Sequence, residues 1–333
     1  MNRLKYIYMF EPKYQITNKL LSNIRRIDRL TDQLNNRRFP SIILAEFKKT
    51  AQAVSSHTST GIEGNPLPLT EVRKLLKSRP QHIRDTEKEV LNYNQALQNL
   101  DKNINFSIDL ILEVQKQVID GLLPSNESGS FRKKPVVVNN PQSGNIVYIP
   151  PDAADVNKLM SDLVEYINAN QSQIDPFILA GIFHKQCVIV HPFMDGNGRT
   201  TRLITKALLA KMKLDTFNLF SFENYYHQNI SKYFQTVGEY GDYYEVKDKI
   251  DFTLWLEYFT DGLIDELLRV GALLPKENLI LDFVSKHGQI ADRDYAKITT
   301  RAKATRALDF KKLVDTGSLK RIGRGRATYY VKV

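Results

Sequence analysis

The stretch HPFMDGNGRTTR, residues 191–202, determines how the rest of this chain is interpreted. The apolar residues from Ile182 to Val190 before it predict a helix, and a second helix is expected to begin near Arg199. Between the two, residues 196–198 form a Gly-Asn-Gly turn with little side-chain bulk. The stretch therefore predicts a loop between two helices, with backbone N–H groups at the start of the second helix available to an anion.

Four side chains of this loop have complementary chemistry. His191 titrates near neutral pH, so it can take a proton from a hydroxyl group. Asp195 offers a hard oxygen ligand of the kind that Mg²⁺ prefers. Arg199 and Arg202 lie about 60° apart around a helix, so both guanidinium groups can reach one polyphosphate. Together these groups predict a phosphoryl- or nucleotidyl-transfer site.

Each part of the stretch has a plainer interpretation when it is taken alone. A single histidine is usually structural, and Asp-Gly-Asn-Gly is usually a simple turn. A calcium loop would need further acidic ligands, which the sequence lacks here. The specific signal is the complete twelve-residue string.

That string resembles the signature of the Fic family, H-P-F-x-[DE]-G-N-G-R-x-x-R, at every fixed position. The resemblance implies a mainly α-helical Fic core that transfers AMP from ATP, with Mg²⁺, to a Ser, Thr or Tyr hydroxyl of a target protein, self-adenylylation included. It implies that His191 is the general base and that Asp195 binds Mg²⁺. The residues that it places on the nucleotide phosphates are Gly196, Asn197, Gly198, Arg199 and Arg202.

Two β-type runs, residues 135–138 and 146–149, flank a turn-rich segment and predict a small hairpin. Together with Gly129-Ser130-Phe131-Arg132 before it, this hairpin resembles the flap of the family, which lies beside the nucleotide and binds the target segment as an added strand. The resemblance places Val136, Val137, Val138 and Asn139 at the ATP site. The alternative is an ordinary surface hairpin.

The segment Ser231-Lys232-Tyr233-Phe234 resembles the aromatic pair that covers adenine in the family. Phe234 stands where a second tyrosine is commoner, which puts a polar contact there in doubt. Packing of Tyr233 and Phe234 in the core is the alternative.

Residues 59–64 match the inhibitory motif of the family, [ST]-x-x-x-E-[GN], through Ser59, Glu63 and Gly64. The resemblance implies that Glu63 pairs with Arg202 and takes the place of the γ-phosphate, so that ATP binds only in an unproductive pose. The alternative is a helix cap, because Thr60-x-x-Glu63 is also a capping-box pattern.

The last part of the chain is strongly basic. The net charge is +10 over 333 residues, and residues 276–333, with 14 Lys/Arg against 6 Asp/Glu, carry +8 of it. Three helix-type runs followed by two β-type runs predict a winged helix-turn-helix. Contacts to DNA are expected from Lys303 and Arg306 on the recognition helix and from Arg324 and Arg326 in the wing. Protein–protein contact, including a homodimer, is the alternative use, and a solvated surface is another.

The sequence thus predicts an N-terminal helical region with the inhibitory helix (residues 1–100), a Fic catalytic core (101–272) and a winged helix (276–333). No apolar run is long enough to predict a membrane span. The lack of a signal peptide and the single cysteine, Cys187, predict a cytoplasmic protein. The predicted function is protein adenylylation. Alternatives are a DNA-binding regulator with a nucleotide-sensing Fic domain, and a Fic enzyme that removes AMP or transfers another phosphate-containing group.

Overall fold

The computed structural model describes two compact units of the chain. The described residues are 10–35, 41–78, 80, 82–100, 105–140, 143–211, 221–273 and 278–333. By their contacts, one unit ends at Leu267 and the other begins at Leu268. The first unit therefore contains both the predicted N-terminal region and most of the predicted catalytic core.

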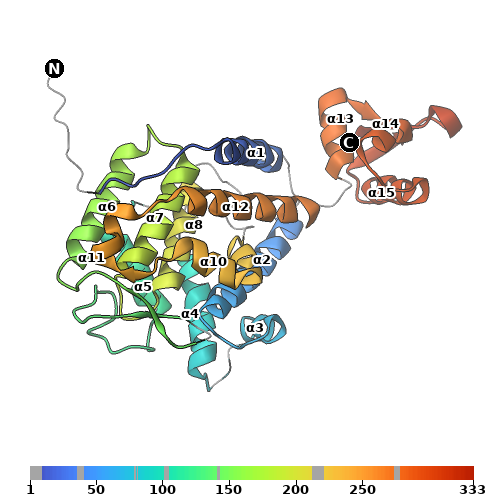
Figure 1. Ribbon diagram of the computed structural model, residues 1–333. Helices are drawn as coiled ribbons and strands as arrows, with labels where there is room; N and C mark the ends of the chain where they lie inside the picture. The colour runs from blue at the N-terminus through green and yellow to red at the C-terminus, as the bar shows by residue number, and fades with distance from the viewer. Residues whose placement is uncertain are drawn as a thin grey trace. The chain divides into compact units, whose positions relative to one another are not determined.

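Helix α7 (Pro176–Val190) lies in the middle of the first unit (Figure 1). It begins where the Asp175 side chain accepts a hydrogen bond from the Phe177 N–H at 2.9 Å, with Pro176 at the first helical position. From Phe177 to Val190 every residue except Val188 is buried, as expected of a helix that is apolar on all sides. The run that predicted a helix before the loop is thus the core of this unit.

Several helices of the first unit pack directly against α7 or α8. Helix α7 contacts α6, α8 and α10, and α8 contacts α2, α4 and α5. The bounds of the other helices of this unit are α1 (Asn18–Asn35), α2 (Ser41–Ile62), α3 (Leu69–Leu75), α4 (Asp85–Asn99), α5 (Ile108–Val118), α6 (Val156–Asn170), α8 (Asn197–Lys211), α9 (Glu223–Gln228), α10 (Ile230–Val237), α11 (Tyr243–Val246) and α12 (Thr253–Leu273).

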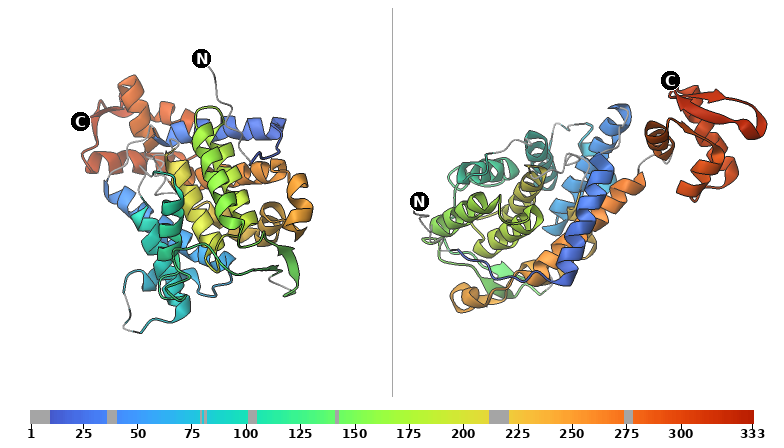
Figure 2. Two further views of the ribbon diagram at one scale, coloured as in Figure 1. Left: turned by 90° about the vertical axis from the view of Figure 1, so that its left-hand side faces the viewer. Right: turned by 90° about the horizontal axis from the view of Figure 1, so that it is seen from above.

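Helix α1 lies alongside the first turns of α12 (Figure 2). The Thr17 hydroxyl, just before α1, donates to Glu257 Oε1 at 2.6 Å, and Asn23 Nδ2 donates to Asp261 Oδ1 at 2.8 Å. These polar contacts flank the buried apolar stripe of α1. They close the first unit by joining its first helix to its last.

A three-stranded sheet forms the predicted hairpin and adds one strand. Strand β1 (Val138–Asn139) pairs antiparallel with β2 (Ile146–Ile149), and β2 pairs parallel with β3 (Gly241–Asp242). The order β1-β2-β3 leaves β1 at an edge of the sheet. The first strand is shorter than predicted, because Val136 and Val137 precede it. Strand β3 was not predicted, since two residues carry no alternating pattern.

The second unit combines three helices with a three-stranded antiparallel sheet of order β4-β6-β5. Its core includes Phe310, which stacks on Tyr330 with ring centroids 4.1 Å apart. The helices and the two strands expected there are formed, and the two-residue strand β4 is additional. The bounds are α13 (Asn278–His287), β4 (Gln289–Ile290), α14 (Asp292–Ile298), α15 (Lys303–Asp315), β5 (Leu319–Ile322) and β6 (Tyr329–Lys332).

Candidate active site

The loop between α7 and α8 is fixed by hydrogen bonds to its own backbone. The buried Asn197 side chain accepts from the Phe193 N–H at 2.8 Å and donates to the Phe193 carbonyl at 2.9 Å. Gln115 Nε2 on α5 donates to the Asp195 carbonyl at 3.2 Å. Gly196 has a φ of 81°, a conformation that glycine adopts without strain. The loop is therefore held in one shape by buried partners.

His191 ends α7 in the left-handed conformation, with φ 48° and ψ 61°. Among the described residues it is the only non-glycine with positive φ. Its N–H donates to the Cys187 carbonyl at 3.0 Å, and its carbonyl accepts from Arg132 Nε at 2.8 Å. The backbone of this histidine is thus held from both sides in a sparsely populated conformation.

The surroundings of His191 keep its imidazole neutral. Burial lowers the pKa of His191 to about 4, although the nearby Glu63 carboxylate acts in the opposite direction. Nδ1 is buried, and the backbone of Val188 acts, like Glu63, to raise the pKa. At neutral pH the ring can therefore accept a proton rather than donate one.

Arg202 is fully buried against the end of α2. Its Nε donates to Ser59 Oγ at 2.7 Å, and its Nη2 donates to the Ser59 carbonyl at 2.8 Å and to Glu63 Oε1 at 2.6 Å. Burial opposes the charge, but the Glu63 carboxylate raises the pKa of Arg202 above its ordinary value. The structure thus contains the contact between Glu63 and Arg202 that the motif predicted.

Gly198 makes room for this ion pair. A Cβ atom at this position would collide with Glu63 Oε1 and would lie 2.9 Å from Arg202 Nη1. Glu63 therefore lies directly against the first turn of α8, where backbone N–H groups favour a negative charge.

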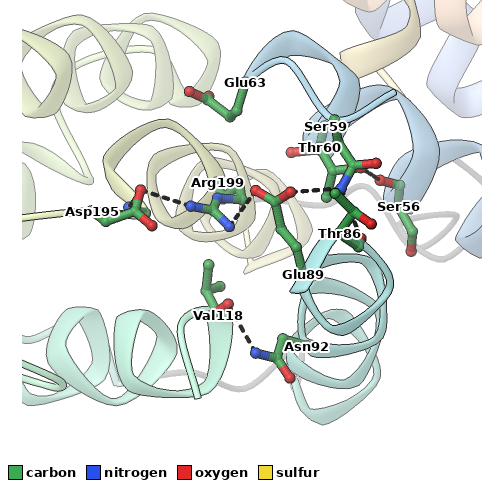
Figure 3. A network of polar contacts seen from close by, with 12 residues as sticks. Ser56, Ser59, Thr60, Glu63, Thr86, Glu89, Asn92, Val118, Asp195 and Arg199 are labelled. Atoms are coloured by element: carbon green, nitrogen blue, oxygen red, sulfur yellow. Dashed lines mark hydrogen bonds and ion pairs between the residues drawn. The ribbon is translucent and has the colours of Figure 1, made fainter. Parts of the chain in front are cut away.

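Arg199 lies between Glu89 and Asp195 and pairs with both carboxylates (Figure 3). Its side chain is 4% exposed, with Nη1 at 2.5 Å from Glu89 Oε1 and Nη2 at 2.8 Å from Asp195 Oδ1. The sequence predicted that Arg199 and Arg202 bind one polyphosphate together. In the structure Arg199 pairs with Glu89 on α4, and Arg202 pairs with Glu63 at the end of α2. Contact of Arg199 with a phosphate would need another side-chain position.

A cavity of about 410 Å³ opens beside His191, a size typical of small-molecule sites. It is walled by the end of α2, the hairpin, the starts of α8 and α10, and the segment after α10. The predicted residues that line it are Glu63, Gly64, Val138, Asn139, His191, Asn197, Gly198, Arg202, Tyr233 and Phe234. Those that do not line it are Ser59, Val136, Val137, Asp195, Gly196 and Arg199.

The hairpin is anchored at its base and exposed along its edge. Tyr148 in β2 is buried and donates to the Ile189 carbonyl at 3.2 Å, and Arg132 Nη2 donates to the Pro151 carbonyl at 2.5 Å. Val137, just before β1, is 44% exposed. The anchored base sets the position of β1 beside the cavity, and the edge stays open to a further strand.

The aromatic pair divides between the core and the cavity. Tyr233 is 1% exposed, stacks on Tyr226 at 4.7 Å and shares a 3.0 Å hydrogen bond with His184 Nε2. Phe234 is half-buried and lines the cavity. Tyr233 therefore packs mainly in the core, and Phe234 presents the more accessible aromatic face.

Two further residues hold the site through contacts that were not predicted from the sequence. Arg132 donates to the carbonyls of His191 and Pro151 and so joins the catalytic loop to the hairpin. Lys185 donates to the Thr236 and Val237 carbonyls at the end of α10. A lysine inside a mainly apolar helix was an available signal for Lys185. The flap resemblance included Arg132, but nothing in the sequence marks that side chain as buried.

Asp195 suits a magnesium ion that arrives with a nucleotide. Its side chain is 48% exposed, and its Oδ1 accepts from the Gly196 N–H at 2.6 Å. Mg²⁺ is commonly held by one or two carboxylates together with substrate phosphates. The described residues contain no group of three or more His, Cys, Asp or Glu side chains that could hold a metal by themselves. A single carboxylate ligand is therefore compatible with Mg²⁺ and not with a closed protein site.

These features define a helical domain with a Gly-Asn-Gly loop at the start of a helix, a neutral histidine and a buried arginine around one cavity. Residues 105–209, which include the whole string from His191 to Arg202, match the Fic/DOC family. Residues 105–209 therefore match a Fic domain, and the mainly helical fold of the chain agrees with that assignment.

Curated relatives and solved structures agree with this assignment. The protein adenylyltransferase Fic of Aedes aegypti is 30% identical over 195 residues, which are 56% of this chain and 38% of that protein. The protein of the same name from Drosophila melanogaster is 32% identical over 176 residues, 50% of this chain and 34% of that protein. The chain thus spans well under half of the length of these relatives.

Two solved structures share the fold. A Fic family protein from Desulfovibrio desulfuricans G20 has a TM-score of 0.66 at 19% identity and covers 97% of this chain and 98% of its own. Fic-1 from C. elegans, residues 134–508, has a TM-score of 0.59 at 24% identity and covers 76% of this chain and 72% of its own.

Across the described part of the chain, no helix has the length and apolar character needed to cross a membrane.

Proposed function

We propose that this chain is a protein adenylyltransferase that moves AMP from ATP to a hydroxyl group of a protein. The observation that carries the proposal is a neutral histidine and a buried arginine on the wall of one cavity, both in the Fic string. The relatives named protein adenylyltransferase support the same activity. A location in the reducing cytoplasm is part of the proposal and rests on the single, buried Cys187.

The proposed chemistry is an in-line displacement at the α-phosphorus of ATP. Because Nδ1 of His191 is buried, we assign the proton acceptor to Nε2. As Nε2 takes the proton, the target oxygen bonds to the α-phosphorus, and the bond to the bridging oxygen breaks and releases pyrophosphate. Arg202 and the N–H groups that begin α8 stabilise the phosphate charge. Asp195 would hold Mg²⁺, which neutralises part of that charge when it is bound.

In this proposal Glu63 inhibits the resting protein. Its carboxylate pairs with Arg202 and lies against Gly198, where a negative group of the nucleotide would otherwise bind. A phosphate and Glu63 would compete for the same guanidinium, so ATP would bind in a pose that does not react. The hairpin completes the proposal, because the open edge of β1 can take a target segment as an added strand.

The test is incubation of the wild type, Glu63→Gly and His191→Ala with α-labelled ATP and Mg²⁺. Glu63→Gly should label itself or an added protein more strongly than the wild type does. His191→Ala should label nothing while it still binds ATP, because the base is lost and the phosphate site remains. Absence of label from both the wild type and Glu63→Gly, each folded, would rule out the adenylyltransferase. Loss of label from a protein labelled beforehand would instead indicate AMP removal.

DNA binding by the second unit is a second proposal. Lys303 on α15 and Arg324 before η3 (Gly325–Ala327) are exposed and can reach phosphates. Arg306 differs from the expectation, because its Nε and Nη2 bind the Asp292 carboxylate at 2.7 and 2.9 Å. It holds α15 to α14 and is not available to a base or a phosphate. The side chain of Arg326 lies outside the described residues.

Filter binding to mixed DNA at several salt concentrations tests this second proposal. Binding that weakens linearly on a log–log salt plot, and that is reduced by Lys303→Ala and by Arg324→Ala, would support it. No binding at low salt would exclude a DNA-binding regulator and leave protein contact as the use of this unit.

A further inference from the structure

The end of the inhibitory helix is joined to the catalytic loop by a second set of polar contacts besides the pair of Glu63 with Arg202. Residues 63–65, which follow α2, are called the inhibitory turn here. Gly64 has a φ of 94°, and the Asn65 N–H donates back to the Thr60 carbonyl at 3.1 Å. The side chain of Asn65 then leaves the turn and contacts Thr86 and Glu89 on α4.

Asn65 uses every polar group of its side chain. Its Nδ2 donates to Glu89 Oε2 at 2.6 Å and to the Thr86 carbonyl at 2.8 Å. Its Oδ1 accepts from the Leu67 N–H at 3.1 Å. Hydrogen bonds to a charged acceptor are among the stronger ones in proteins. The inhibitory turn is therefore fixed to α4 chiefly through the carboxylate of Glu89.

Glu89 also holds the catalytic loop. Its other oxygen, Oε1, lies 2.5 Å from Arg199 Nη1, and Arg199 Nη2 lies 2.8 Å from Asp195 Oδ1. The Glu89 side chain is 17% exposed, so this charge is screened less than a surface pair. One carboxylate thus connects the turn that carries Glu63 with the arginine and the aspartate of the catalytic string.

We propose that Glu89 is a positioning residue that couples the inhibitory turn to Arg199, so that loss of the Asn65–Glu89 bond weakens inhibition by Glu63. The inference rests on the proposed function of Glu63. If the inhibitory turn withdraws, the hydrogen bond from Asn65 to Glu89 breaks. If Arg199 moves, Glu89 loses its ion pair with Arg199. Each movement makes the other easier, as two events that share one partner are coupled. Both arginines of the string are then restrained by acidic residues of the N-terminal part of the chain.

The main test is Asn65→Asp, which keeps the shape of the side chain and places a carboxylate against Glu89. Labelling with α-labelled ATP should rise about fivefold or more, the usual scale of such a coupling. Adding Glu89→Gln should lower the labelling again. In that double variant the Gln amide can donate to the new carboxylate while its oxygen accepts from Arg199. In a Glu63→Gly background Asn65→Asp should have no effect, because inhibition is already absent.

The matched control is Asn92→Ala, one turn further along α4. Asn92 Nδ2 donates to the Asp120 carbonyl at 2.9 Å and to the Val118 carbonyl at 3.3 Å, at the end of α5 (Figure 3). It is a half-buried amide on the same helix that does not touch the inhibitory turn. Its loss should leave labelling at the wild-type level, so a rise equal to that of Asn65→Asp would mean that any loosening of α4 is sufficient and would overturn the proposal.

Two readouts separate failure of this inference from failure of the proposed function. Labelling by Glu63→Gly together with wild-type labelling by Asn65→Asp would refute the role of Glu89 and leave the transferase intact. No labelling by any variant would refute the transferase. Hydrogen exchange would still test the network in that case, because the Glu63, Gly64 and Asn65 amides should exchange faster in Asn65→Asp and slow again in the double variant. Unchanged exchange would refute the network as well.

Discussion

The catalytic loop and the hairpin lie beside the same cavity but differ in how they are held. The loop from His191 to Asn197 is fixed by buried side chains, among them Arg132 and Gln115. The hairpin is anchored only at its base, and its apolar residues Val137, Ile146 and Ile149 are 44%, 57% and 44% exposed. The groups that the proposed reaction would bring to a phosphorus atom are held by buried contacts, whereas the surface that a proposed target would touch is open.

This difference suits the loop to the transfer reaction and the hairpin to recognition of the target. A transfer reaction needs the same geometry for every target, because small displacements of reacting groups cost large factors in rate. Recognition of a segment through backbone pairing needs an open strand edge and tolerates different side chains. We infer that changes in the loop will affect chemistry on all targets, and that changes in the hairpin will affect the choice of target.

The largest effect is expected from loosening the loop. Asn197→Ala removes both hydrogen bonds to Phe193 and leaves buried backbone groups without partners. In a Glu63→Gly background, labelling should fall by about a hundredfold, since the reacting groups are misplaced. Unfolding in denaturant should show a loss of about 1–3 kcal/mol. Normal labelling by this variant would show that the loop does not need its internal support.

A smaller effect is expected from the hairpin. Val137→Asp places a charge on the open edge and should reduce labelling of an added protein about tenfold, the equivalent of roughly 1.4 kcal/mol of binding. Affinity for ATP, measured by calorimetry, should not change. Leu254→Asp is the control, because Leu254 is also an exposed apolar residue but lies on α12. Equal losses in the two variants would contradict a specific role for the hairpin.

The pH dependence should be smaller still. Protonated His191 cannot accept a proton, and burial lowers its pKa to about 4. Glu63 acts to raise that pKa, so its removal moves the value further down. Labelling by Glu63→Gly should therefore change little between about pH 8 and pH 6 and decline only as the solution approaches the lowered pKa. An inflection near the ordinary histidine pKa of about 6.5 would contradict the neutral base.

The sequence predicted the parts of the site that are local in the chain. The string from His191 to Arg202, the hairpin and the helix before the loop all depend on spacing within about a dozen residues. The contact of Glu63 with Arg202 was also predicted, although only through the family resemblance.

The remaining contacts could not be predicted, because their partners are distant and have no periodic signal. Arg199 was expected on the phosphates, and nothing in its neighbourhood points to Glu89 on α4. Arg306 was expected on DNA, and its partner Asp292 lies on another helix. From sequence alone, an arginine near a predicted anion site is expected to bind the ligand. In the folded protein an acidic residue from a distant part of the chain can bind that arginine instead.

The left-handed backbone of His191 is unfavourable for a residue with a side chain, and it occurs at the position proposed to act as the base. Asparagine adopts this conformation more readily than alanine, which costs about 1 kcal/mol more there. Both His191→Asn and His191→Ala should be inactive, but His191→Asn should unfold at the higher temperature. The protein would then be more stable with asparagine than with alanine at position 191, and histidine would be kept there for the proposed reaction and not for stability.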